Sequence, residues 1–230
     1  MLPLSQSQLY TFWYITGVDR SSVIFYSVQN KADMARPRSF DTADALAAAT
    51  QVFLARGFDG ATLDDLTEAM GINKPSLYAA FGDKGALYAA VLGGYAASAM
   101  AAMETALNSG HTLHEATRNL LIGAIDQYAP LKHDPLGCLV ATTATTVAGS
   151  NPDVRKVLAA FLTDVDRLIR ETIERRFAED VTPTGAALVT DLLTGTLFSL
   201  AIRARARIPR KQLLAVAERA IESIGMIEKA

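Results

Sequence analysis

The sequence has little cysteine, little histidine and almost no net charge. Its 230 residues contain one Cys, three His, and 22 Lys and Arg against 24 Asp and Glu, a formal net charge of −2 at pH 7. A single cysteine excludes a disulfide framework and a cysteine-rich zinc site, and it is typical of a reducing compartment. Because no global positive charge exists, any binding to nucleic acid must depend on a few locally placed cations.

The sequence also lacks the common motifs of catalytic sites. The chain shows no Gly-rich phosphate loop and no Ser-His-Asp set. His111 and His114 lie one turn apart beside Glu115 and could ligate a metal, but near a helix start such residues are more often exposed polar groups. We therefore expect no enzyme, no cofactor and no metal.

The long uncharged runs of the sequence are poor candidates for a signal peptide or a membrane span. Three uncharged stretches cover residues 1–18, 85–103 and 135–152. The first lacks a basic start, the second is rich in Ala and Gly, and the third is interrupted by Gly, Thr, Ser and Asn. The sequence predicts a cytoplasmic protein with no membrane partner.

The composition changes at Met34. The first 33 residues hold six aromatic residues, including the only Trp, and only four charged ones, whereas the following chain is rich in Ala. We expect residues 1–33 to be a poorly ordered N-terminal extension, followed by a domain at 34–92 and a larger one at 93–230.

Helix start and stop signals predict an all-α protein from residue 40 onward. Asp41 or Thr42 can begin a helix that ends at Gly57, and Thr62 with Asp65 forms a capping-box pattern. The further helices are expected at about residues 62–71, 73–81, 83–107, 113–129, 136–148, 151–177, 184–207 and 210–227.

The stretch 62–81 has the pattern of a helix-turn-helix. Two short helices are joined by a turn that contains Gly71, so the first would brace the second against a major groove. Spacing alone does not separate this interpretation from any pair of short helices in an all-α protein.

The second of these helices carries polar side chains on one face. Lys74, Ser76 and Tyr78 can hydrogen-bond to DNA, while Leu77 and Phe81 point inward. Lys84 opens the next helix, whose N-terminus can dock a phosphate. Arg36 and Arg38 form a short basic arm that could lie along the backbone or enter the minor groove.

With these residues the sequence resembles the N-terminal DNA-binding domain of the TetR/AcrR family of transcriptional regulators. The resemblance covers residues 34–95 and rests on MARPRSFD, on AxxxFxxxGFxGAT at 49–62, and on LxxLxxAMGINKPSLYAAFGDKGALY at 63–88. It implies a three-helix helix-turn-helix domain joined to a helical ligand-binding and dimerisation domain. It also implies DNA contacts at Thr62, Lys74, Pro75, Ser76, Tyr78 and Lys84, with Lys74, Pro75 and Ser76 nearest the bases and Tyr78 and Lys84 on phosphates.

The charge of the domain opposes this interpretation. Residues 34–92 hold five cations and seven acids, 5 − 7 = −2, so the acids must face away from the duplex or cap helices. We expect Asp41, Asp65 and Asp83 to be caps, and we expect DNA affinity to require a dimer and to fall steeply with salt.

Residues 93–230 resemble the effector-binding half of the family more weakly. A dimer is expected through the last two long helices, or through the pair at 151–177 and 184–207, with an apolar stripe at Leu188, Leu192, Thr196, Leu197 and Leu200. The same stripe could instead fill the core of the monomer. Candidate effector-binding residues are Tyr95, Met103, Tyr128, Cys138, Thr142, Phe161 and Phe198, each of which is more often a core residue.

The sequence therefore predicts a dimeric regulator of transcription, a repressor that binds a palindromic operator in double-stranded DNA and is released by a small-molecule effector. The alternatives are a helical enzyme and a helical interaction protein without sequence-specific DNA binding. The effector, the operator, the direction of regulation and a sensing role for Cys138 stay open at this point.

Overall fold

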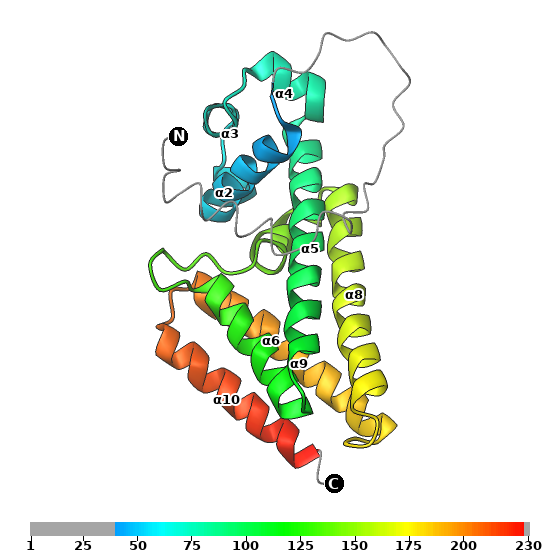
Figure 1. The fold of residues 1–230 in the computed structure, drawn as a ribbon. Coiled ribbons are helices and arrows are strands. Elements are labelled where there is room, and N and C mark those ends of the chain that lie inside the picture. The colour runs from blue at the N-terminus through cyan, green and yellow to red at the C-terminus, as the bar shows by residue number, and fades with distance from the viewer. Residues whose placement is uncertain (1–39, 228–230) are drawn as a thin grey trace, which may run out of the picture.

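The computed structural model describes residues 40–227 of the chain, which are helical and contain no strand (Figure 1). The segment 1–33 and the arm residues Arg36 and Arg38 lie outside the described residues, so the expectations for them stay predictions. The helices are α2 (Thr42–Gly60), α3 (Leu63–Met70), α4 (Lys74–Phe81), α5 (Lys84–Ser109), α6 (Leu113–Tyr128), the π-helix η1 (Val140–Ala144), α7 (Thr145–Val147), α8 (Pro152–Arg176), α9 (Pro183–Arg205) and α10 (Arg210–Ile227).

Side-chain caps set the boundaries of the first helices. Asp41 accepts hydrogen bonds from the backbone of residues 43 and 44 at the start of α2. The Thr62–Asp65 capping box begins α3, and Gly71, at φ 66°, ends it. The interior of α2 is broken at Gly57, at φ 72° and ψ −179°, where the sequence predicts its end. The expected all-α fold with an N-terminal helix-turn-helix is confirmed.

The long helix α5 joins the two parts of the molecule. Its N-terminal end packs against α2 and α4, and it continues alongside α6 and α8 through the larger helical part (Figure 1). In that larger part α9 contacts α6, α8 and α10. A residue in the first turns of α5 and one deep in the larger part thus belong to a single continuous helix.

Three aromatic side chains form the core where α2 meets α5. The fully buried rings of Phe53 and Tyr88 meet edge to face with centroids 4.8 Å apart, and Phe58 lies 5.0 Å from Tyr88. Leu66 of α3 and Leu77 of α4 are also completely buried. This core fixes the helix-turn-helix on the first turns of α5.

The helix expected at 136–148 is in part wrong. The backbone of residues 134–138 is irregular, helical geometry begins at Leu139, and a π-helical segment follows. Leu136 and Gly137 both donate backbone hydrogen bonds, each 3.1 Å, to the carbonyl of Tyr128. Gly137 has φ 71°, and a Cβ there would lie 2.5 Å from the carbonyl oxygen of Ala201 on α9. A contact with a helix more than sixty residues away in the chain therefore overrides the local helical tendency.

Two helices, α5 and α9, are long and apolar enough to cross a membrane by length and composition alone. In the fold they are packing helices, with 39% and 50% of their most apolar windows buried inside the protein. Core helices pass the same test, so the finding is weak evidence for a membrane span.

Candidate nucleic-acid interface

The first turn of α4 is exposed at the surface of the small domain, by which we mean the described part of residues 34–92. Asn73 caps it by accepting a hydrogen bond of 2.8 Å from the Ser76 backbone, and Pro75 occupies a position where the missing amide hydrogen costs little. Lys74 and Pro75 are exposed and Ser76 is half-buried. One turn later Leu77 is completely buried, while Tyr78 is 50% exposed. The helix is thus anchored by its apolar side, and its polar side is accessible to solvent.

Lys74 has a partner that the sequence analysis does not anticipate. Its ammonium lies 2.7 Å from Oδ1 of Asp64 in the first turn of α3, with both side chains solvent-accessible. The hydrogen bond to Asp64 raises the pKa of Lys74 above its ordinary value. The base-reading candidate on α4 therefore carries a carboxylate beside it.

Thr62 is committed to the helix cap. Its hydroxyl donates to Oδ2 of Asp65 at 2.7 Å and accepts from the Asp65 backbone at 3.1 Å. The hydrogen bonds from Thr62 and the neighbouring Arg56, whose guanidinium is 2.7 Å away, lower the pKa of the Asp65 carboxyl. A contact from the Thr62 hydroxyl to a phosphate would have to share this network.

Lys84 lies at the start of α5. Its side chain is half-buried, and its ammonium stands 4.5 Å from the centroid of the Phe58 ring. Asp83 caps the helix by accepting from the backbone of Ala86 at 2.8 Å. The cation is therefore positioned next to the unpaired amides of the first helical turn.

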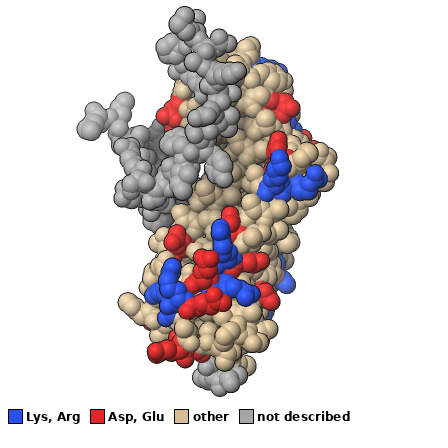
Figure 2. All heavy atoms as spheres, turned by 90° about the vertical axis from the view of Figure 1, so that its right-hand side faces the viewer, with Lys and Arg blue, Asp and Glu red and all other residues tan. Residues whose placement is uncertain are grey.

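The expected capping roles of three acids are confirmed. Asp41, Asp65 and Asp83 each accept backbone hydrogen bonds at the N-terminus of a helix. Asp64 does not share this role, because its carboxylate contacts Lys74. Charge is also mixed elsewhere: on the side of the molecule shown in Figure 2, positive and negative side chains intermingle over the lower half.

The structure brings four of the predicted effector residues together, Tyr95, Tyr128, Cys138 and Thr142. The hydroxyls of Tyr95 on α5 and Tyr128 on α6 hydrogen-bond to the Cys138 side chain, which is 1% exposed. The Thr142 hydroxyl donates to the Cys138 carbonyl at 2.6 Å. Met103 and Tyr128 adjoin a cavity of about 40 Å³ between α5 and α6, large enough for little more than a water molecule. Phe161 is buried on α8, and Phe198 on α9 is half-buried.

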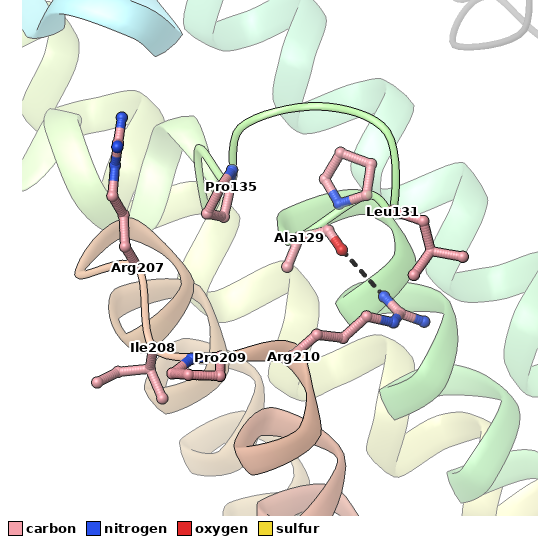
Figure 3. A pocket seen from close by; sticks show the side chains of 8 residues that line it. Ala129, Leu131, Pro135, Arg207, Ile208, Pro209 and Arg210 are labelled. Atoms are coloured by element: carbon pink, nitrogen blue, oxygen red, sulfur yellow. Dashed lines mark hydrogen bonds between the residues drawn. The ribbon is translucent and has the colours of Figure 1, made fainter.

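A larger and more open cavity of about 220 Å³ lies where α9 turns into α10 (Figure 3). Residues from the loop after α6 line one side and residues from the turn line the other, and none of them belongs to the predicted effector set. Arg210 lies at its edge, where its guanidinium donates to the carbonyls of Ala129 and Ile125 at 3.0 and 3.3 Å. Three prolines, Pro130, Pro135 and Pro209, lie in this lining and mark breaks between helices in the sequence.

The proposed dimer stripe divides into two sets. Thr196, Leu197 and Leu200 are buried in the core of the monomer, which confirms the core alternative for them. Leu188 is 53% exposed. Ile202, which also lies on α9 but outside the predicted stripe, is 57% exposed. The outward side of α9 thus keeps an apolar surface that the described residues do not cover.

Two contacts connect the larger helical part to the small domain. The guanidinium of Arg205, in the last turn of α9, donates to the carbonyls of Leu54 and Ala55 in α2. The Tyr88 hydroxyl on α5 lies 2.5 Å from the hydroxyl of Thr143 in η1. These contacts tie α9 to α2 and η1 to α5.

Comparisons with known proteins agree on one group. A family model described as bacterial regulatory proteins, tetR family, matches residues 45–91. The HTH-type transcriptional repressor BdcR of Escherichia coli strain K12 is 30% identical over 192 residues, which cover 84% of this chain and 93% of that protein. The repressor ComR of the same organism is 27% identical over 189 residues, or 81% and 90% of the two chains.

A solved structure extends the likeness. A cysteine mutant of the TetR family transcriptional regulator CifR, complexed with 26-bp double-strand operator DNA, is 36% identical, with a TM-score of 0.73 over 82% of this chain and 99% of that one. The reduced form of E. coli NemR, at 20% identity and a TM-score of 0.64, shares the fold.

Proposed function

Because the chain belongs to the TetR family of bacterial regulatory proteins, we propose that it represses transcription by binding a palindromic operator as a homodimer. The observation that carries the proposal is the first turn of α4, which is capped by Asn73, anchored by Leu77 and exposed at Lys74 and Pro75. Such a turn is what a reading helix inserts into a major groove.

The DNA contacts divide into two kinds. Lys74, Pro75 and Ser76 read base edges from the first turn of α4, because these residues stand at its free end. Tyr78, Lys84 and Thr62 bind phosphates and fix the register of the domain on the duplex. Arg36 and Arg38, outside the described residues, extend the contact as a basic arm along the backbone or into the minor groove.

A second copy of the chain covers the outward side of α9. Leu188, Leu192, Gly195, Ser199 and Ile202 recur at steps of three and four, so they form one stripe along the helix. Both helix pairs considered from the sequence, α9 with α10 and α8 with α9, contain this helix. A two-fold dimer of this kind presents two reading helices to successive major-groove faces.

Release requires an effector that binds the DNA-incompetent arrangement more tightly. We place the effector at the cluster of Tyr95, Tyr128 and Cys138, extended by Met103, Thr142, Phe161 and Phe198, where a small apolar molecule with one or two polar groups would have to widen the cavity of about 40 Å³. The helix α5 connects it to the DNA, since it carries Lys84 at one end and Tyr95 and Met103 further along. We place the whole cycle in the cytoplasm, without a membrane or cofactor.

The test is a binding titration with the DNA that flanks the protein's own gene. We expect a Kd for one palindromic segment well below that for scrambled DNA. Lys84→Ala should weaken binding to all sequences, whereas substitutions of Ser76 should change which sequence is preferred. Equal binding by the wild type and Lys84→Ala contradicts the phosphate contact, and a stable dimer without any selective DNA binding supports an interaction protein instead.

A further inference from the structure

Of the two acids in the first turn of α3, Asp64 is the one whose carboxylate does not cap the helix. Its neighbour Asp65 supplies the capping box and pairs with Arg56. The Asp64 side chain is 80% exposed, and its carboxylate lies 2.7 Å from the Lys74 ammonium. Within residues 40–227 it forms no other ion pair.

This ion pair bridges the two helices of the helix-turn-helix at the surface offered to DNA. Lys74 is the first residue of α4, and its side chain is 48% exposed. In the free protein its charge is therefore balanced by the Asp64 carboxylate. Guanine is neutral, so Lys74 can contact O6 and N7 with two of its three N–H donors while it keeps its contact with Asp64. A phosphate in the same place would set a second negative charge against the Asp64 carboxylate.

We propose that Asp64 is a specificity-determining residue, which holds Lys74 and so weakens binding to DNA that lacks the base contact more than binding to the operator. The proposal rests on the DNA-binding function proposed above. Asp64 acts as a positioning residue, because it reaches the DNA through Lys74. It also explains why a domain with so few cations carries an acid beside its reading helix.

The expected size of the effect follows from the geometry. An exposed ion pair changes an equilibrium by a factor of up to about five. Freeing one lysine for a phosphate adds roughly 0.9 per protomer to the slope of log Kd against log salt concentration. Both changes are measurable, and both should be larger for non-specific DNA.

The experiment compares full-length wild type, Asp64→Asn and the matched control Asp59→Asn on two duplexes, the selected operator and a scrambled duplex of equal length. Asp59 is exposed, lies in the same domain and forms no ion pair with another described residue, so its substitution removes the same charge without touching Lys74. For Asp64→Asn we expect the scrambled duplex to be bound about three to five times more tightly, the operator less than about twofold more tightly, and the salt slope for scrambled DNA to steepen. Asp59→Asn should change neither.

A double variant tests whether Asp64 acts through Lys74. In a Lys74→Met background, Asp64→Asn should leave the affinity for scrambled DNA and its salt slope unchanged. Equal gains on both duplexes, gains no larger than those of Asp59→Asn, or gains that persist without Lys74 overturn the proposal. A wild type that binds both duplexes alike overturns the proposed function itself, so the two failures are distinguishable.

Discussion

At the scale of single residues, each described cation of the small domain contacts another side chain in the free protein. Among its described residues these are Arg56 on Asp65, Lys74 on Asp64, and Lys84 over the ring of Phe58. The Lys74–Asp64 pair is exposed and weak, whereas Asp65 and Lys84 are partly buried. We therefore expect phosphates and bases to compete for Lys74 most readily, so that selective binding by a domain with more acids than cations depends on these local contacts.

Cys138 is predicted to be a structural thiol in the free protein. Burial raises its pKa above the ordinary value of a cysteine, and its side chain is 1% exposed, so the reactive thiolate is scarce at neutral pH. It is the only cysteine in the chain, so any label reports this site. Iodoacetamide at pH 8 should modify the native protein at least about a hundredfold more slowly than the urea-unfolded protein, as followed by intact mass. Rapid native labelling would support a sensing role instead.

Tyr88 should make stability fall at alkaline pH. Burial is the main cause that raises its pKa from 10.0 to about 12, so the folded protein keeps the phenol neutral at pH values where the unfolded chain ionises it. This contribution is complete below pH 10 and is lost as the pH rises towards 12. Between pH 8 and pH 11 the free energy of unfolding of the wild type should drop by about 1 kcal/mol more than that of Tyr88→Phe.

Urea titrations at several pH values measure this difference. At pH 7, Tyr88→Phe should cost about 1 kcal/mol, since it removes one buried hydrogen bond while Thr143 still donates to the carbonyl of Leu139. Identical pH profiles for the two proteins would show that the phenol does not carry the effect.

At the scale of elements, the sequence predicts those helix boundaries that are set by interactions between residues close together in the chain. Asp41, Thr62 with Asp65, Asn73 and Asp83 lie within three residues of the amides that they cap, so the helices of the helix-turn-helix could be placed to within a residue or two. The irregular segment before η1 could not, because Gly137 is held against Ala201 by the tertiary fold. The Asp64–Lys74 pair was missed for the same reason, since it joins two helices across a turn.

Gly137 is predicted to be essential for the packing of this segment on α9. A Cβ at Gly137 would meet the Ala201 carbonyl at 2.5 Å, whereas a Cβ at Gly71, which also has a positive φ of 66°, would meet nothing within 4 Å. Gly71→Ala should therefore cost only the left-handed backbone strain, about 1 kcal/mol. Gly137→Ala should cost about 1 to 3 kcal/mol more, because the loop or α9 must move.

Thermal or urea unfolding of the two variants separates strain from contact. Hydrogen exchange adds a second readout, since Gly137→Ala should increase exchange in η1 and at the C-terminal end of α9, while Gly71→Ala should affect the turn between α3 and α4. Equal destabilisation by both substitutions would mean that the contact with Ala201 carries no energy.

At the scale of the whole molecule, the small domain is attached at more than one point. The helix α5 passes through both parts, Arg205 reaches from α9 to the end of α2, and Tyr88 meets Thr143 of η1. The candidate effector residues lie on α5, α6, α8 and α9 and in the segment around η1. An effector that separates these elements would thus change the spacing or tilt of α4 without touching it, provided that it binds the two arrangements unequally.

The dimer interface is predicted only ambiguously from the sequence. Some apolar residues of α9 fill the monomer core, and others are available for a partner subunit. Thr196, Leu197 and Leu200 fill the monomer core, whereas Leu188 and Ile202 are more than half exposed. Replacing both Leu188 and Ile202 by Glu should leave the monomer folded, since neither side chain is buried, but should place charges in the proposed interface. Sedimentation velocity should then show monomers at micromolar concentration, and operator affinity should fall at least about tenfold, because two linked reading helices bind far better than one.

Leu131→Glu is the matched control, since Leu131 is 84% exposed in the loop after α6 and lies outside α9. It introduces the same kind of charge on an exposed apolar residue and should leave both the dimer and the operator affinity intact. A double Glu variant that stays dimeric would rule out this side of α9 and turn attention to α8 and α10, where Leu162 and Met226 are also exposed. A variant that becomes monomeric yet binds the operator with full affinity would instead contradict the expectation that a domain with so few cations needs a dimer to bind DNA.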